Sequence, residues 1–215
     1  MNIANKILEK KLVNVCFLWG RGKTTIANAL RDRYGAAVYS TDDARERLFR
    51  IADPTEQPYL CRDYVKEYKV HSFWELPKEV VADREKHILE ELTPFVVAEL
   101  LPHAAQNRLV ICEGDLDYDT VMKFATRAVY LRNCGTKFNW FDRPDHTNLD
   151  EIRNNPNLTE EHKAEIIENA KNIVTNREDV LPMWVDRLCV PHIDWDDSTA
   201  VCQTVNEVAA LFDLK

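Results

Sequence analysis

The sequence has little positive charge with which to bind a polyanion. Its 215 residues carry 28 Lys and Arg against 36 Asp and Glu, a formal net charge of −8. The resulting field repels phosphate backbones, so nucleic-acid binding would need a local basic patch. The longest basic groupings are short and mixed with acids, as in Arg45, Arg47 and Arg50. We therefore expect no nucleic-acid partner.

Metal-binding, redox and membrane signals are also missing. The 6 cysteines never form a C-x-x-C pair, and the 6 histidines show no H-x-x-x-H spacing. Several cysteines lie in apolar runs, which indicates small buried side chains in a reducing compartment. No stretch reaches membrane-spanning length, and charges interrupt the N-terminal residues where a signal peptide would be apolar. We expect a cytoplasmic protein with no membrane partner.

The sequence does contain a regular alternation of short apolar runs and longer stretches of helical period. The runs cover residues 12–18, 36–39, 109–112, 128–131 and 188–193 and predict strands. Helical patterns lie at 24–34, 42–50, 119–127, 159–176 and 199–212. Buried strands that alternate with helices imply a parallel sheet covered on both faces. We expect a single α/β domain, a three-layer sandwich around a five-stranded parallel sheet.

Two stretches exceed normal connections and predict insertions in this domain. Residues 51–107 contain several aromatic side chains and a long helical pattern at 78–101, which Thr93 and Pro94 break or kink. We interpret this stretch as a helical acceptor-binding insertion whose aromatic residues mostly form its core. Residues 133–176 begin with an irregular polar segment before a helix, and we interpret them as a lid. The sequence does not distinguish a monomer from a homodimer.

Residues 19–25, WGRGKTT, follow the first predicted strand and open the first predicted helix. A phosphate-binding loop has the pattern G-x-x-x-x-G-K-[ST] at this place, because backbone N–H groups must wrap the phosphates. Aligning this pattern puts Phe17 at its first glycine, which is a departure. Strand, loop and helix still occur in the required order, which favours a phosphate loop over a chance G-K-T. The candidate nucleotide-binding residues are Gly20, Arg21, Gly22, Lys23, Thr24 and Thr25.

The stretch STDDARERLF, residues 40–49, follows the second predicted strand. Strand ends in open α/β sheets face the ligand crevice, so Asp42 and Asp43 would lie beside the phosphates. A carboxylate there can accept the proton of an attacking hydroxyl, and Arg45 falls on the same helix face as Asp42. The alternative is plain helix capping by Asp42, with Asp43 in the first turn. The sequence leaves open which of the two acids would be the base.

Residues 108–114, RLVICEG, form an apolar strand that ends in Glu113. This is the form of a Walker B element, whose carboxylate holds Mg²⁺ directly or through water. We therefore predict a metal site made of Glu113 and the Thr24 hydroxyl. Arginines that neutralise a transferring phosphoryl group are expected in or beside the second insertion. Arg177 is the first choice and Arg143 the second among Arg132, Arg143, Arg153 and Arg177.

Taken together, these segments resemble P-loop kinases of the nucleoside monophosphate kinase and shikimate kinase type over most of the chain. The stretch STDDARERLF is also similar to a segment of bacteriophage-type polynucleotide 5'-hydroxyl kinases. Residues 73–101 followed by RLVICEG resemble uncharacterised bacterial P-loop proteins labelled as ATPases or kinase-like. The resemblance implies use of ATP and a hydroxyl acceptor, with Asp42 as base and Arg45 holding the acceptor.

The residues and the resemblance lead to one functional hypothesis and two alternatives. The hypothesis is transfer of the ATP γ-phosphoryl group, with Mg²⁺, to a hydroxyl of a small molecule. Lys23 would neutralise charge on the β and γ phosphates, while Arg45 and Arg177 would clamp the transferring group. One alternative is a P-loop ATPase or GTPase with water as acceptor. The other is a nucleotide-binding module without catalysis, for which Phe17 is the reason.

Overall fold

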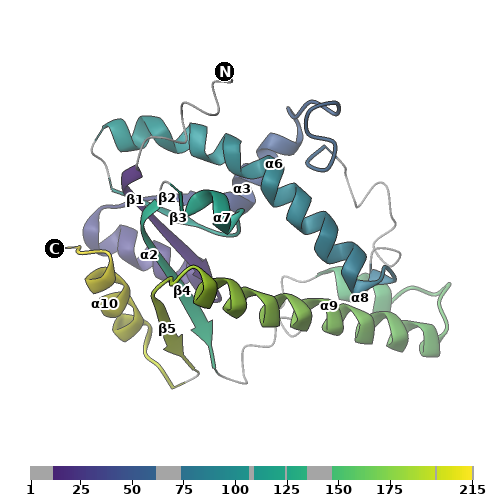
Figure 1. The fold of residues 1–215 in the computed structure, drawn as a ribbon. Helices are drawn as coiled ribbons and strands as arrows, with labels where there is room; N and C mark the ends of the chain where they lie inside the picture. The colour runs from purple at the N-terminus through teal and green to yellow at the C-terminus, as the bar shows by residue number, and fades with distance from the viewer. Residues whose placement is uncertain are drawn as a thin grey trace.

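The structure, a computed structural model, describes residues 12–61, 74–106, 109–123, 125–134, 147–196 and 198–214, without the side chains of 13, 104, 147–148 and 174–183. These residues form the predicted α/β fold around a five-stranded sheet (Figure 1). The strands are β1 (Leu12–Gly20), β2 (Ala37–Ser40), β3 (Val110–Glu113), β4 (Ala125–Asn133) and β5 (His192–Trp195).

The sheet is parallel throughout, with the order β2-β3-β1-β4-β5. The first strand is therefore central, and the chain builds the sheet to one side of it before crossing to the other. In sheets of this kind, ligands bind outside the carboxyl ends of the strands where the order reverses. That place is the end of β1, between the ends of β3 and β4.

Helices cover both faces of the sheet, because side chains of β1 alternate between two cores. Cys16 and Leu18 pack in the core beneath α2 (Lys23–Tyr34) and α10 (Val201–Leu211). Phe17 and Trp19 pack in the opposite core, which also contains residues from the helices of the other face. Those helices are α3 (Thr41–Phe49), α6 (Lys78–Ala105), α7 (Tyr118–Val121) and the carboxyl end of α9 (Glu160–Arg187).

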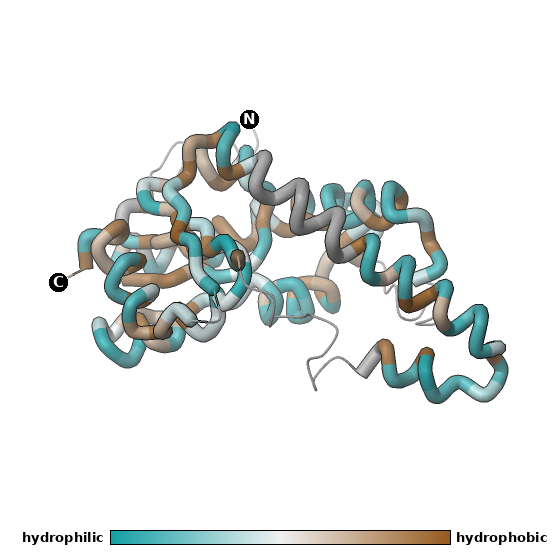
Figure 2. Tube along the Cα trace, turned by 90° about the horizontal axis from the view of Figure 1, so that it is seen from below, coloured by the Kyte–Doolittle hydropathy of each residue, from teal (hydrophilic) through white to brown (hydrophobic). Residues whose placement is uncertain are grey.

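The two predicted insertions share one hydrophobic core away from the sheet. The residues of this core come from α6, α8 (Thr147–Arg153), α9 and the segment before α6: Trp74, Val81, Leu149, Ile152, Ile166, Ala170 and Ile173. Asn169 on α9 donates to the carbonyl of Leu76 (3.0 Å), and His162 lies 2.9 Å from Glu75. Figures 1 and 2 show the long helices projecting from the sheet together. We call this unit the helical arm.

Three local predictions were wrong. The helix expected at 119–127 ends at Val121, because the chain from Ala125 onward pairs with β1. The helix expected at 159–176 runs on to Arg187, and the strand expected at 188–193 begins only at His192. Residues 188–190 are apolar for another reason, since Val190 is buried and packs in the core beside α9.

Helix α6 does not break at Pro94, although proline cannot donate the helical hydrogen bond. Next to it, the Thr93 hydroxyl donates to the Leu89 carbonyl (2.7 Å) and accepts the N–H of Asp117 (2.8 Å). The helix bends on its way from the sheet to the arm (Figure 1). None of the helices in the described part of the chain combines the length and apolar character needed to cross a bilayer.

Candidate active site

The phosphate-loop segment is a tight turn rather than a long loop. Strand β1 continues through Gly20, so only Arg21 and Gly22 connect it to α2. Gly20 has φ +90°, and a Cβ there would lie 2.1 Å from the Leu131 carbonyl oxygen, so no other residue fits. The N–H of Arg21 donates to the same carbonyl (3.2 Å). The turn is thus pressed against β4.

Because β1 continues through Gly20, position 17 lies in a strand, which explains why it holds a phenylalanine in place of the glycine of the pattern. Its side chain is 0% exposed, and its backbone lies in β1 opposite Cys112 of β3 and Ala128 of β4. A strand occupies the place where the standard pattern has the first residue of its loop. The large aromatic side chain is therefore a core residue.

Backbone donors at this site come from the first turn of α2. The first bond within the helix joins the N–H of Ile26 to the Gly22 carbonyl (3.1 Å). The N–H groups of Gly22, Lys23, Thr24 and Thr25 consequently have no acceptor within the helix, and Gly22 provides no side-chain cap. Such a helix end combines N–H donors with a partial positive charge, which favours an anion.

Glu113 lies beside this helix end and is only 2% exposed. The Thr24 hydroxyl donates to its Oε2 (3.1 Å), and the Ser40 hydroxyl also hydrogen-bonds to it. Burial raises the pKa of the Glu113 carboxyl, Lys23 opposes this shift, and the charge of Asp42 adds to it. Thr24 and Glu113, the predicted metal-binding pair, are thus in contact. Lys23 and Asp42 are near enough to shift the pKa of Glu113.

The two aspartates after β2 lie in the first turn of α3, and both are exposed. Ser40 caps this helix, since its Oγ accepts the N–H of Asp43 (3.3 Å). The alternative interpretation of Asp42 as the cap is therefore wrong. Thr41 packs directly on the chain leaving β3, because a Cβ on Gly114 would lie 1.9 Å from the Thr41 hydroxyl. This close approach brings the start of α3 to Glu113.

Three of the predicted arginines pair with acidic side chains in the described part of the chain. Arg45 forms two hydrogen bonds with Glu85 of α6 (2.8 and 3.1 Å). Arg132 pairs in the same bidentate way with Asp194, at 2.6 and 2.7 Å. Arg153 pairs with Asp150 within α8. Arg177 lies in α9 with its side chain outside the described residues, and Arg143 lies outside them altogether.

Two residues near the turn were missed by the sequence interpretation. Ser40 was interpreted only as the start of an acidic stretch. Its hydroxyl, which can cap a helix and bond a carboxylate, was the signal in the sequence. Trp195 ends β5, and its Nε1 donates to the carbonyl of Arg21 (3.2 Å). The fifth strand predicted at 188–193 ends before Trp195, so this side chain was not expected beside Arg21.

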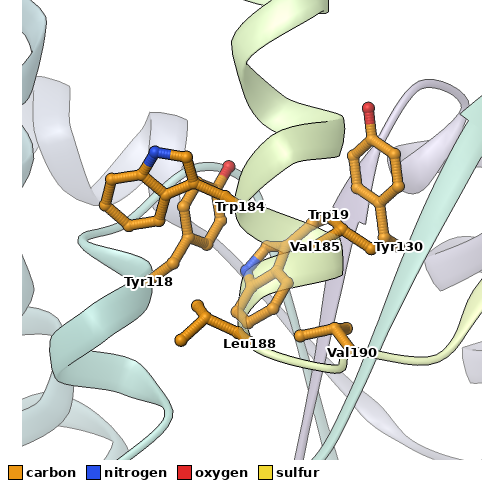
Figure 3. A pocket seen from close by; sticks show the side chains of 7 residues that line it. All are labelled: Trp19, Tyr118, Tyr130, Trp184, Val185, Leu188 and Val190. Carbon is orange, nitrogen blue, oxygen red and sulfur yellow. The ribbon is translucent and has the colours of Figure 1, made fainter.

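An aromatic pocket lies on the α9 side of β1, next to the turn (Figure 3). Tyr118 stands edge-on to both Trp19 and Trp184, with ring centroids 4.7 and 5.2 Å apart. The Tyr118 hydroxyl donates to Asp115 (3.0 Å). The remaining lining residues are Tyr130, Val185, Leu188 and Val190. The carboxyl end of α9 and Trp19, the residue just before Gly20, thus line the same pocket.

Comparisons with known proteins add little to this geometry. No family model matches the chain, and no curated protein matches it. A solved structure, dephospho-CoA kinase from Campylobacter jejuni, is similar over 93% of this chain and 96% of that one, with 12% identity and a TM-score of 0.42. A likeness at that level does not indicate an activity.

Proposed function

We propose that this protein transfers the γ-phosphoryl group of Mg-ATP to a hydroxyl of a small molecule. The observation that carries the proposal is the 3.1 Å hydrogen bond between Thr24 and Glu113 at the start of α2. A hydroxyl and a carboxylate beside backbone donors match the needs of a metal-bound triphosphate. The lysine that precedes Thr24 completes the set.

The oxygen atoms of Thr24 and Glu113 at the start of α2 are suitable ligands for Mg²⁺. Magnesium prefers oxygen ligands, keeps several waters, and is usually held by one or two carboxylates together with substrate phosphates. Glu113 and Thr24 supply such oxygens. Within the described ranges, no group of three or more His, Cys, Asp or Glu side chains could hold a metal by itself. A metal shared with phosphates does not need such a group, and when bound it neutralises charge on the β and γ phosphates.

The remaining residues divide the work between nucleotide and acceptor. The N–H groups of Gly22, Lys23, Thr24 and Thr25 bind phosphate oxygens, and the Lys23 ammonium offsets the charge that develops during transfer. Gly20 and Arg21 set the path of the turn. We place the Lys23 charge at the phosphates because Lys23 is close enough to Glu113 to lower the pKa of that carboxyl.

The acceptor would lie on the α3 side, where Asp42 is exposed and near Glu113. Asp42 takes the proton of the attacking hydroxyl as the phosphoryl group moves. Arg45 contacts the acceptor only together with Glu85, because the two side chains are already paired. This pair offers a small molecule both donors and acceptors. Arg177 as a clamp from the arm stays a prediction.

The test is ADP release from Mg-ATP by the native protein, alone and with pooled hydroxyl metabolites. Lys23→Ala removes the proposed phosphate contact, and Lys171→Ala removes an exposed lysine of the arm, which pairs only loosely with Glu168 (3.7 Å), as a control. We expect acceptor-dependent release that disappears in Lys23→Ala and persists in Lys171→Ala. Release that is independent of every acceptor would favour water as the acceptor, and ATP binding without any release would favour a binding module. Unchanged turnover in Lys23→Ala would contradict the site.

A further inference from the structure

The turn between β1 and α2 is held in place by three neighbouring strands. From β4, the Leu131 carbonyl accepts the N–H of Arg21 (3.2 Å). From β3, Glu113 accepts the Thr24 hydroxyl (3.1 Å). From β5, the Trp195 indole donates to the Arg21 carbonyl (3.2 Å). The first two contacts involve Arg21 and Thr24, on either side of Gly22. The third binds the peptide group between Arg21 and Gly22.

Trp195 is itself well anchored. Its carbonyl accepts the N–H of Cys134 (2.8 Å), which continues the pairing of β5 with β4. Part of its ring packs against the core beneath α2 and α10. The ring also covers Gly22, because a Cβ on Gly22 would lie 3.2 Å from Cζ2 of Trp195. The side chain thus makes two contacts with the turn, one polar and one by packing.

Gly22 determines how the backbone donors of α2 are aimed. It is the N-cap of the helix, with φ +79° and ψ +1°. A glycine populates positive and negative φ about equally, so the residue itself does not favour this conformation. If the turn samples other conformations, the apparent affinity for an anion is the intrinsic affinity multiplied by the fraction of molecules in the competent conformation.

We propose that Trp195 is a positioning residue that holds Gly22 and the Arg21 carbonyl in the conformation that binds nucleotide phosphates. This inference rests on the proposed function for its ligand. Trp195 acts through the turn and does not contact the transferred group. It compensates for the shortness of the turn, since a strand occupies the segment that would otherwise form the phosphate loop.

Two variants separate the contacts that Trp195 makes. Trp195→Phe keeps an aromatic ring near Gly22 and removes the indole N–H, whereas Trp195→Ala removes both. We expect dissociation constants for ATP to rise about fivefold in Trp195→Phe, the factor that corresponds to one hydrogen bond. In Trp195→Ala the rise should be on the order of 20-fold, because Gly22 is no longer covered. Trp74→Phe, at a tryptophan of the arm core, is the matched control.

The choice of ligand distinguishes positioning from base stacking. Calorimetric titrations would use ATP, inorganic tripolyphosphate and adenosine, with circular dichroism to show that each variant is folded. Positioning predicts equal fold losses for ATP and tripolyphosphate and none for adenosine. A loss for adenosine with tripolyphosphate unaffected would overturn the proposal, because Trp195 would then contact the base.

A second measurement needs no ligand. Hydrogen exchange of the Arg21 and Ile26 amides, both bonded within or to the turn, should accelerate in Trp195→Ala and stay unchanged in Trp74→Phe. Unchanged exchange in Trp195→Ala would overturn the inference while leaving the proposed function intact. If the native protein binds neither ATP nor tripolyphosphate, the proposed function fails and this inference fails with it.

Discussion

Replacing Phe17 by glycine restores the complete phosphate-loop pattern, and the structure predicts that this change unfolds the protein. In the sequence pattern, glycine at this position belongs to a loop that wraps a phosphate. In the fold, Phe17 is a fully buried residue of the central strand and its ring lies 6.2 Å from that of Trp19. The substitution therefore removes a core side chain without creating a loop.

The size of the effect follows from burial. Truncation of a buried Phe to Ala costs about 3–5 kcal/mol. Glycine in a strand interior costs about 0.5–1 kcal/mol more than alanine. The sum, about 4–6 kcal/mol, is comparable to the whole stability of many domains, about 5–15 kcal/mol. We expect Phe17→Gly to be largely unfolded or barely stable.

Urea denaturation followed by circular dichroism measures this loss, with the free energy of unfolding extrapolated to water. Phe17→Leu is the matched control, since a roughly volume-conserving exchange should cost less than about 1.5 kcal/mol. The reasoning is refuted if Phe17→Gly loses less than about 1 kcal/mol and binds ATP more tightly than the native protein. That result would mean that residues 17–20 form a loop.

Three further predictions follow from burial and charge. Burial raises the pKa of Glu113, so the charged carboxyl destabilises the fold at neutral pH, and Glu113→Gln should be more stable there. The gain should vanish as the pH falls below the ordinary carboxyl pKa, and a pH series of urea denaturations checks it; equal stabilities at pH 7 would refute it. Burial raises the pKa of Cys16 to about 11 and raises that of Cys112 further, so at pH 8 an alkylating reagent followed by mass spectrometry should leave both unmodified in the folded protein. The exposed thiols should react first, namely Cys134, Cys189 and Cys202. Trp74 is 7% exposed in the arm core, so Trp74→Ala should lower stability by about 3–5 kcal/mol and accelerate hydrogen exchange in the arm more than in the sheet; uniform exchange would contradict a separate arm core.

The sheet could be predicted because its strands are nearly continuous apolar runs. Buried parallel strands need such runs, and four of the five were recognised close to their observed positions. The exceptions depended on contacts distant in sequence. Ala125 joins β4 through pairing with β1, and Val190 is apolar because it packs in the core beside α9. Local periodicity contains no information about either contact.

In the candidate site, too, the individual residues could be predicted from local sequence, whereas their contacts could not. The motif GKT identified Thr24 at the start of a helix, and the end of an apolar strand identified Glu113. Their contact follows from the parallel pairing of β1 with β3, in which Leu18 lies opposite Glu113. The pairing of Arg45 with Glu85 was invisible, because α6 lies far along the chain and only the folded arm brings it to α3.

The insertions predicted at 51–107 and 133–176 contribute to one hydrophobic core, and their roles as acceptor cover and lid stay predictions. Both insertions were recognised from their length, but length does not show that Val81 of α6 and Ile166 of α9 share a core. Any movement that encloses the substrate of the proposed transfer would therefore carry the first part of α6, α8 and the first part of α9 together. Domain closure in enzymes is usually a movement of such packed units.

The central claim is that Thr24 and Glu113 bind the metal of a metal–nucleotide complex, and the magnesium dependence of ATP binding tests it most directly. ATP is titrated into the native protein and into Glu113→Gln, each with Mg²⁺ and with a chelator. The account predicts tighter binding with Mg²⁺ in the native protein and no such difference in Glu113→Gln. Equal affinities with and without Mg²⁺ in the native protein, or a difference that persists in the variant, would contradict it.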